Sequence, residues 1–513
     1  MIMKRFCHAI LACGVFAAVV AAASCTKDAT GGGGGGYDGE PEVNHDMDGI
    51  LRRNYLWNEE YATLSPDFGL PYDEFLGDVL MRMKTNDLDK KFRNGRWQLY
   101  SNIQRLSPVS RVALSADIDS QFPKEPVYGF GIVSLAIISY TDNGGAETGQ
   151  YGFAVMAVYP DSPMARAGLG RGTIINQVDG QWITAGNLNT VYSKLLAPNG
   201  AATLSVADNQ GGFGVSEHKL TAELIYENPV LYRDVLEYGE HKIGYLVYAS
   251  FDAAFDGELL DALQAFKDAD INDLILDLRL NGGGYVMSSR MLASCIAGAR
   301  CEGQVFQYYR YNDARMEYPE MTAAETGQAY DESKERFYEE FIYGDYRGAD
   351  LRGYALDLPR LYVIVSSGTA SASEAVVNAL RGIGLEVVLV GQKTNGKNVG
   401  MEGVYLEDGA YEYLFMPVSF QGYNARLETV DPNGLAPDAL KGDWNNGYEE
   451  FGSLDDPCLE YAVTSITGQS VRSSESAAQR RPGVRLVEGL SLPEISCRPE
   501  GMILLPPDAV RKD

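Results

Sequence analysis

A serine-rich turn between a predicted strand and a predicted helix is the feature that most constrains this chain. The turn, Thr369 to Glu374, follows the apolar run Leu361–Val365 and precedes a helical pattern from Val376 to Leu380. The next apolar run leads into Thr394-Asn395-Gly396-Lys397, so an adjacent strand would return a lysine to the serine turn. A serine hydroxyl needs a neighbouring base, and a lysine can serve when burial favours its neutral amine.

The histidines of the chain favour a serine–lysine pair over a serine–histidine–aspartate triad. Only four are present, His8, His45, His218 and His241, and none lies in either segment. Taken alone, the turn also has an interpretation without chemistry. Thr369, Ser371 or Ser373 would cap the following helix, with Glu374 as the acidic partner of a capping box.

A second motif lies upstream and carries three consecutive glycines. The apolar run that begins at Leu274 continues through Asp277-Leu278-Arg279 to Asn281 and then to Gly282, Gly283 and Gly284, before another helical pattern. Free backbone N–H groups at such a site can stabilise a developing oxyanion. Together, Asp-Leu-Arg-x-Asn-Gly-Gly-Gly, Thr-Ala-Ser-Ala-Ser-Glu and Gly-Lys resemble, in that order, the carboxyl-terminal processing peptidases of serine peptidase family S41.

The resemblance covers roughly residues 123 to 440 and implies a role for each matching residue. The family nucleophile falls on Ser371 and the general base on Lys397. The oxyanion hole falls on the backbone N–H of Ala372 and of a glycine in the triple run, Gly283 or Gly284. The substrate implied is a polypeptide, and no cofactor and no metal is expected.

Some positions leave alternatives open. Ser373 competes as nucleophile and Lys393 as base, but the motif alignment and the mobility that Gly396 gives the backbone favour Ser371 and Lys397. Many family members carry a glutamine four residues after the lysine, where this chain has Met401, and Glu402 is the candidate replacement. This departure keeps a second hypothesis open, a catalytically inactive peptide-binding lipoprotein with the same fold.

Length and charge limit the partners. With 513 residues the chain can form several domains, and a formal charge of −27 argues against nucleic acid, which needs a basic surface. No CxxC or histidine-bearing cluster indicates a metal site. The sequence does not predict an oligomeric state.

The N-terminus predicts export. Lys4 and Arg5 precede an apolar run from Phe6 to Ala23, and six glycines follow at Gly31 to Gly36. The stretch ending in Cys25 resembles a bacterial lipobox, which implies a signal peptide at 1–24 and a lipid-anchored, Gly-rich linker at 25–40. We therefore expect an exported lipoprotein, periplasmic or at the cell surface, that is anchored to the outer membrane through its lipid. Four further cysteines remain in the exported part: Cys295, Cys301, Cys458 and Cys497. Disulfides are possible in an oxidising compartment, and a local Cys295–Cys301 bridge is feasible. The sequence does not determine the pairing.

The remaining chain predicts a multidomain α/β protein. Residues 41–122 form a helical N-terminal domain, on the helical spacing of Tyr72, Phe75, Leu76, Val79, Leu80 and Met83. Residues 123–227 resemble a β-rich PDZ domain, which adds a peptide as an extra strand and holds its terminal carboxylate on a backbone loop. The loop residues are Gly129, Phe130, Gly131 and Ile132.

Residues 228–445 alternate strands and helices, which predicts a βαβ catalytic core, and the resemblance implies its ClpP/crotonase-like form. Within it, residues 302–358 are either an insertion near the substrate groove or a solvated excursion. Residues 446–513 form a C-terminal extension, and the role of its polar, Pro-rich end is not predicted.

Overall fold

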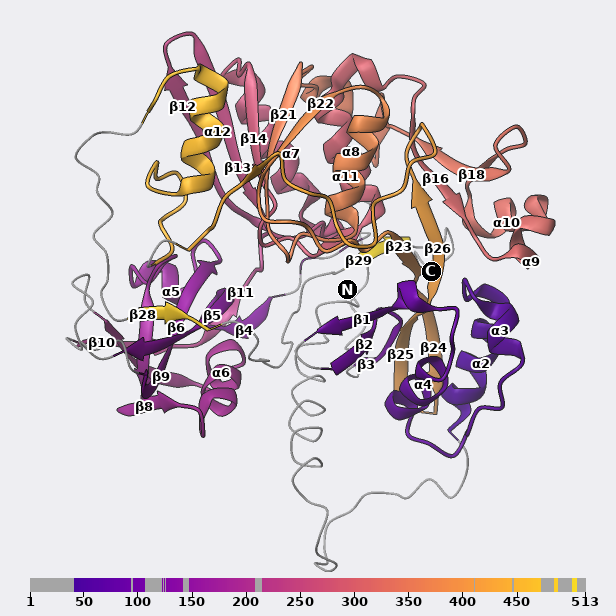
Figure 1. Cartoon of the computed structure of the whole chain (residues 1–513), viewed down its shortest axis with the longest axis horizontal. Coiled ribbons are helices and arrows are strands. Elements are labelled where there is room, and N and C mark those ends of the chain that lie inside the picture. The colour runs from indigo at the N-terminus through magenta and orange to yellow at the C-terminus, as the bar shows by residue number, and fades with distance from the viewer. Residues whose placement is uncertain are drawn as a thin grey trace, which may run out of the picture.

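The computed structural model describes residues 41–93, 96–106, 122, 124, 126–141, 147–207, 215–409, 411–444, 447–471, 484–487 and 501–504 (Figure 1). The predicted signal peptide, linker and lipidated Cys25 lie outside these residues. No helix in the part that is described is both long enough and apolar enough to cross a membrane.

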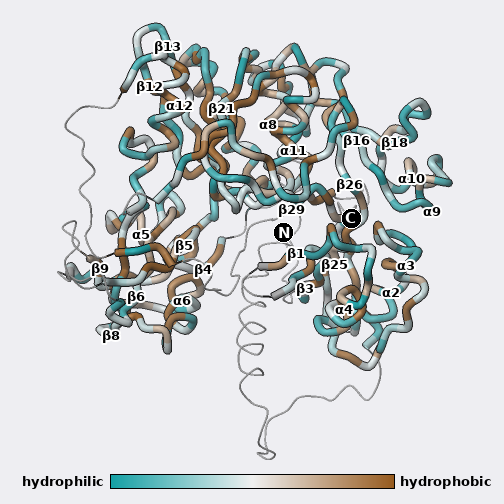
Figure 2. The backbone as a smooth tube through the Cα atoms, viewed as in Figure 1, coloured by the Kyte–Doolittle hydropathy of each residue, from teal (hydrophilic) through white to brown (hydrophobic). Residues whose placement is uncertain are grey.

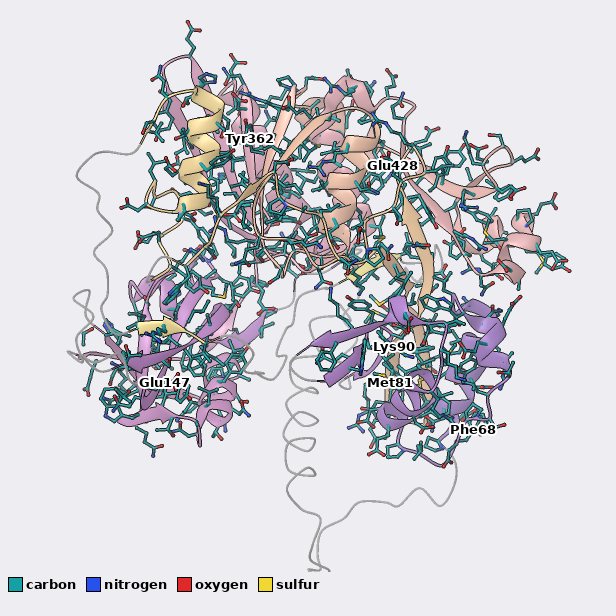
Figure 3. All side chains as sticks on the ribbon, in the orientation of Figure 1. Phe68, Met81, Lys90, Glu147, Tyr362 and Glu428 are labelled. Atoms are coloured by element: carbon teal, nitrogen blue, oxygen red, sulfur yellow. The ribbon has the colours of Figure 1, made fainter. Side chains whose placement is uncertain are left out.

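The N-terminal region begins with three helices and ends in strands. The helices are α2 (Glu42–Asn54), α3 (Asn58–Ala62) and α4 (Tyr72–Met81). The predicted apolar face of α4 is buried from Phe75 to Leu80. Three strands follow that the helical pattern did not predict: β1 (Lys90–Arg93), β2 (Arg96–Leu99) and β3 (Asn102–Leu106). Figure 3 shows Phe68, Met81 and Lys90 in this region, with Lys90 on the hairpin strand β1.

Those three strands form because the chain offers them partners far along the sequence. β1 and β2 pair as an antiparallel hairpin, and β3 pairs with β25 (Tyr411–Met416), which in turn pairs with β24 (Val404–Asp408). Segments of four or five residues with so few apolar side chains cannot be assigned to a strand or a helix from the sequence, because long-range pairing decides their state.

The second region is a separate sheet with two helices. Its strand order is β10-β9-β7-β8-β6-β5-β28, and β4 pairs with β11 beside it. The helices are α5 (Pro163–Arg166) and α6 (Leu188–Leu196). The strands are β4 (Val127–Gly129), β5 (Ile132–Thr141), β6 (Glu147–Val158), β7 (Ile174–Val178), β8 (Gln181–Thr184), β9 (Ala201–Ala207), β10 (Val215–Thr221), β11 (Glu223–Ile225) and β28 (Val484–Leu486).

The third region has the alternating architecture that the sequence predicts. Its first sheet has the order β12-β13-β14-β21-β22-β27, and the four strands from β13 to β22 run parallel. These strands are β12 (Val230–Tyr238), β13 (His241–Tyr248), β14 (Asp273–Asp277), β21 (Arg360–Val365), β22 (Glu386–Gly391) and β27 (Ala439–Leu440). The molecule is therefore a multidomain α/β protein.

Helices cover both faces of this sheet. One face packs on α7 (Asp256–Asp268), α8 (Val286–Ala297) and α11 (Ala372–Gly382), and the other on α12 (Pro457–Thr467). Tyr362 of β21 lies on the α12 side, as Figure 3 shows. Figure 2 shows the most hydrophobic segments gathered on the central strands, because a parallel sheet covered on both faces buries both sides of each strand.

A second sheet of the third region has the order β15-β29-β23-β26-β16-β18-β17. Its strands are β15 (Gly283–Tyr285), β29 (Gly501–Leu504), β23 (Val399–Glu402), β26 (Val418–Tyr423), β16 (Val305–Arg310), β18 (Arg336–Glu340) and β17 (Ala329–Asp331). The insertion at 302–358 thus extends this sheet with three strands and also carries α9 (Asp313–Glu317) and α10 (Pro319–Thr326). It also contains the short pair β19 (Asp345–Tyr346) and β20 (Ala349–Asp350).

The described cysteines are thiols. Cys295, Cys301 and Cys458 are free and buried, so the feasible Cys295–Cys301 bridge is not formed, and Cys497 lies outside the described residues. Burial raises the pKa of the Cys295 thiol to about 12 and that of Cys301 to about 11, which makes both poor nucleophiles near neutral pH.

The buried carboxyl of Asp256, at the start of α7, should make the free energy of unfolding depend on pH. Burial raises its pKa to about 7, although Tyr346 and Arg347 both donate to its carboxylate. Because the folded state keeps this proton at pH values where the unfolded state has lost it, the free energy of unfolding should fall between about pH 4 and pH 7, by up to about 4 kcal/mol.

Urea denaturation of the wild type and of Asp256→Asn across that range measures the effect. The wild type should lose stability relative to the variant as pH rises to 7, and the difference should then level off. Asp350→Asn is the control, because hydrogen bonding to Arg352 lowers the pKa of this exposed carboxyl and places its titration below the same window. Parallel curves for the wild type and Asp256→Asn would contradict the prediction.

Candidate active site

Ser371 lies at the turn between β21 and α11, and its backbone is strained. It has φ 61° and ψ −110°, a conformation that side-chain-bearing residues seldom adopt. The residue is fully buried, and within the described part of the chain its Oγ has no hydrogen-bond partner. A buried, unpartnered hydroxyl on a strained turn costs stability, a combination that is common at functional sites.

Glu374 joins the serine turn to the lysine loop. Its Oε2 accepts from the backbone N–H of Ser371 at 2.8 Å and from that of Lys397 at 3.0 Å. Its Oε1 accepts from the Thr394 hydroxyl at 2.5 Å and from the Gly396 N–H at 2.7 Å. The carboxylate therefore serves as the predicted helix-capping partner and also holds the backbones of Ser371 and Lys397 together.

The backbone before Lys397 depends on glycine. Gly396 has φ +86°, and a Cβ there would lie 2.3 Å from the carbonyl oxygen of Pro432. A second close approach lies opposite, where a Cβ on Gly434 would lie 2.0 Å from the Thr394 carbonyl oxygen. These two glycines let the loops pack closely, as the sequence predicted for Gly396.

Lys397 is nearly buried, with 7 % of its surface exposed. Its Nζ lies 3.9 Å from Sδ of Met401, at the position where the related peptidases often have glutamine, and 4.4 Å from the centre of the Tyr100 ring. Glu402, the candidate replacement, forms a buried ion pair with Arg315 at 2.6 Å. Around the amine, Met401 and Tyr100 thus provide a thioether and an aromatic face.

Sequence reasoning missed the contribution of the N-terminal region. Tyr100 donates its hydroxyl to Oδ1 of Asn395 at 2.9 Å, and Lys91 donates to the same oxygen at 2.8 Å. Asp89 is buried and accepts from Ser101 and Tyr55. Burial raises the pKa of its carboxyl, and these hydrogen bonds oppose that rise. No sequence signal marks these residues, because the contact spans some 300 positions.

The two competing residues occupy less suitable places. Ser373 is buried and donates its hydroxyl to the carbonyl oxygen of Asn281 at 3.1 Å. Lys393 is exposed. Geometry therefore favours Ser371 and Lys397.

The glycine run forms the short strand β15. The N–H of Gly283 donates to Oδ1 of Asn281 at 2.9 Å, so this amide already has an acceptor. Gly284 has φ +137°, and a Cβ there would lie 2.2 Å from the carbonyl oxygen of Phe251. Of the predicted oxyanion donors, Gly283 thus has an acceptor, Gly284 lies opposite Met502 in the pairing of β15 with β29, and Ala372 begins α11 directly after Ser371.

The predicted carboxylate loop joins β4 to β5. Gly129 ends β4, Phe130 is buried in the core of the second region, and Ile132 begins β5. Gly131 has φ +85°, and a Cβ there would lie 2.1 Å from Cβ of Ser162, so the turn requires glycine. At Gly129 a Cβ would meet only the Gly131 nitrogen, at 3.7 Å.

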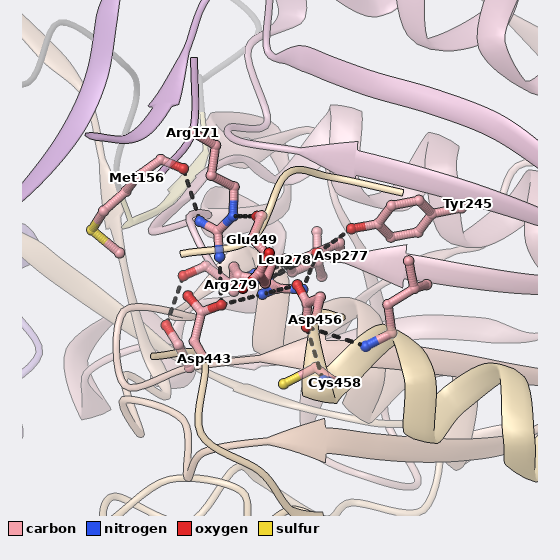
Figure 4. Close-up of polar contacts among 12 residues, drawn as sticks. Met156, Arg171, Tyr245, Asp277, Leu278, Arg279, Asp443, Glu449, Asp456 and Cys458 are labelled. Atoms are coloured by element: carbon pink, nitrogen blue, oxygen red, sulfur yellow. Dashed lines mark hydrogen bonds and ion pairs between the residues drawn. The ribbon is translucent and has the colours of Figure 1, made fainter. Parts of the chain in front are cut away.

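A buried charge cluster links the second region to the Asp-Leu-Arg motif and to the start of α12 (Figure 4). Arg279 of the Asp-Leu-Arg motif pairs with Asp277 at 2.7 Å and with Asp456 at 2.7 Å, and Asp277 also accepts from Tyr245 at 2.9 Å. Asp443 accepts from both Arg279 and Arg171, and the two guanidinium groups lower the pKa of its carboxyl against the effect of burial. Arg171 of the second region is thus linked through Asp443 to Arg279 of the Asp-Leu-Arg motif.

Comparison with known proteins shows which family the third region resembles. Residues 242–439 match the model of peptidase family S41. Carboxyl-terminal-processing proteases of Synechocystis and of Picosynechococcus are 27 % identical over 323 residues and 24 % identical over 314 residues, covering 63 % and 61 % of this chain and 66 % of each relative. A solved Bacteroides fragilis structure, titled as an S41 protease, aligns with a TM-score of 0.62 at 23 % identity and covers 82 % of this chain and 97 % of its own.

The third region thus contains the stretch, residues 242–439, that matches peptidase family S41. The chain spans 49 % of a chloroplastic processing peptidase of Arabidopsis thaliana and 66 % of the two bacterial relatives.

Glu374 should act as a positioning residue. Glu374→Gln keeps the size of the side chain, but the amide nitrogen cannot accept two of the four hydrogen bonds, so the free energy of unfolding should fall by about 1–3 kcal/mol. Peptide hydrolysis should fall as well, with a larger loss in kcat than in KM, because the Ser371 and Lys397 loops separate. The matched control is Glu428→Gln, which makes the same change at an exposed residue, labelled in Figure 3. Full kcat in Glu374→Gln would contradict this role.

Proposed function

We propose that the chain is an exported serine endopeptidase of the S41 processing type, with Ser371 as nucleophile and Lys397 as general base. The observation that carries the proposal is Glu374, whose one oxygen binds the backbone amides of both residues. The family match of residues 242–439 supports it. The strained Ser371 turn and the near-burial of Lys397 are consistent with a site built for chemistry rather than for stability.

The reaction proceeds through an acyl-enzyme. Neutral Lys397 accepts the Ser371 hydroxyl proton as Oγ attacks the peptide carbonyl carbon, and the oxyanion is held by the amides of Ala372 and Gly284. The ammonium of Lys397 returns its proton to the leaving amine as the peptide bond breaks. Water then gives a proton to Lys397 as its oxygen attacks the ester carbonyl carbon. The Lys397 ammonium returns that proton to Ser371 Oγ as the ester bond breaks and the second product leaves.

The second region would deliver the polypeptide. We place the substrate carboxylate at the turn from Gly129 to Ile132 and its backbone along β5, in the manner of PDZ domains. Export and lipid attachment at Cys25 would place the enzyme in the periplasm or at the cell surface, anchored to a membrane.

Digestion of fluorescein-labelled, denatured casein tests the activity. The purified wild-type chain should release soluble fluorescence, and Ser371→Ala should not. Intact casein after prolonged incubation with the wild type would instead favour the inactive peptide-binding lipoprotein, for which Met401 in place of glutamine is the specific observation.

Carboxylate capture is tested separately at Gly129. A larger residue there meets little in the fold, so Gly129→Val should fold normally, but it should crowd the loop amides and weaken binding of free-acid peptides by about tenfold. Gly186→Val is the matched control in the same region, where a Cβ would lie 3.9 Å from its nearest neighbour. Equal binding of free-acid and amidated peptides by the wild type would contradict the role.

A further inference from the structure

Two short strands of the C-terminal extension lie at the two places that a polypeptide substrate would use. β28 (Val484–Leu486) adds to the sheet of the PDZ-like region, and β29 (Gly501–Leu504) adds to the sheet that carries the glycine run. Both are visible in yellow in Figure 1, β28 on the lower left region and β29 beside β23. No role was predicted for these segments from the sequence.

β28 occupies the edge of β5. It is the last strand in its sheet and pairs antiparallel with β5, with Val484 opposite Tyr140 and Leu486 opposite Ile138. The pairing continues at Val487, whose N–H donates to the Ile137 carbonyl oxygen at 2.9 Å. Because β5 starts at Ile132, directly after the carboxylate loop, β28 runs toward that loop in the direction of a captured peptide.

β29 lies between the glycine run and the strand that follows Lys397. On one side it pairs with β15, with Gly501 opposite Gly283 and Met502 opposite Gly284. On the other side Ile503 pairs with Met401 of β23. β29 also contacts α11, the helix that begins after Ser371. The segment therefore runs beside the oxyanion candidates, the nucleophile helix and the neighbour of the base.

The residues of β29 and the proposed nucleophile are shielded from solvent. Met502 and Ile503 are each 2 % exposed, and Ser371 is fully buried. A peptide bond cannot reach a buried Oγ unless something moves. β29 is a candidate for that movement, because it contacts α11 and is held in its sheet by two short parallel pairings, with β15 and with β23.

We propose that the C-terminal extension is an intramolecular substrate mimic. Its residues 484–487 fill the edge of β5 from Ile137 to Tyr140, and its residues 501–504 fill the strand position between β15 and β23. An extended polypeptide substrate takes the same two places by displacing them, so substrate binding and relief of inhibition are one step. This inference rests on the proposed peptidase function. The opposing interpretation is that β29 only completes a sheet.

Labelling of Ser371 by a fluorophosphonate probe in the full-length chain separates the two. In the inhibited state, residues 484–487 and 501–504 occupy their places in the two sheets. Detaching β29 by Ile503→Asp or β28 by Val484→Asp should therefore raise the labelling rate about tenfold or more. Arg485→Ser is the matched control, since this exposed residue lies between two inward-facing positions of β28, and it should label like the wild type. Adding a synthetic peptide of residues 484–504 to Ile503→Asp should slow its labelling again, whereas a scrambled peptide should not.

Hydrogen–deuterium exchange provides a second measurement without altering the extension. In full-length Ser371→Ala, denatured casein should increase exchange at residues 484–487 and 501–504 and leave β14 protected. Unchanged exchange there, or variants that label at or below the wild-type rate without recovery by the peptide, would overturn the inference while wild-type labelling upholds the peptidase. No labelling in the wild type or any variant would instead overturn the peptidase function itself, and the inference with it.

Discussion

Replacing Ser371 with alanine should lower peptide hydrolysis by about four orders of magnitude or more while raising the free energy of unfolding. Activity falls because the attacking oxygen is lost. Stability rises because the variant removes a buried hydroxyl that has no partner among the described residues, worth about 1–3 kcal/mol. Casein digestion and urea denaturation of the same preparations measure both effects.

Ser371→Gly extends this prediction to the backbone. Glycine adopts φ 61° and ψ −110° without strain, and the relief of about 1–3 kcal/mol exceeds the cost of about 0.4–1 kcal/mol that glycine's freedom in the unfolded chain adds, so this variant should be more stable than Ser371→Ala. Ser373→Ala is the control, since it removes a bond to Asn281 and leaves Oγ of Ser371 in place. Normal turnover in Ser371→Ala with loss in Ser373→Ala would show that the motif has been aligned on the wrong serine.

Replacing Lys397 should have the second largest effect. Lys397→Ala and Lys397→Arg should lose hydrolysis alike, by roughly three to four orders of magnitude, because guanidinium stays protonated and cannot accept the serine proton. In the wild type, kcat/KM should rise with pH along one basic limb as the lysine loses its proton. Stopped assays on a fluorogenic peptide between pH 6 and pH 10 measure both.

Two histidine variants are the controls for that limb. His218 contacts Ser216 and His241 contacts Asp273, on β10 and β13, away from the serine turn in sequence. Alanine at either should leave the pH profile unchanged. Substantial activity in Lys397→Arg, or a lost limb in either histidine variant, would mean that another residue is the base.

The catalytic core was predictable because its signals are local. Strand β14 with the Asp-Leu-Arg motif, helix α8 and the Ser371 turn before α11 all lie where the apolar runs and the serine motif placed them. Each is an apolar strand or an amphipathic helix bounded by glycine or serine, so its state depends little on the rest of the chain.

The surroundings of the lysine were not predictable for the opposite reason. Tyr100 reaches Lys397 only because β3 pairs with β25 and brings the N-terminal region against the loop. Glu374 was assigned a capping role from its position, but its bonds to Thr394 and Gly396 join segments that only the tertiary fold brings together. Likewise, β28 and β29 are too short to be recognised without their partner strands.

The most direct test of the central proposal, that Ser371 is a nucleophile activated by Lys397, is to locate a fluorophosphonate adduct by peptide mass spectrometry. The wild-type chain should carry one adduct on Ser371, labelling should rise with pH, and Lys397→Ala should remain unlabelled over the same time. An adduct on Ser373 or elsewhere, or equal labelling of Ser371 in Lys397→Ala, would contradict it.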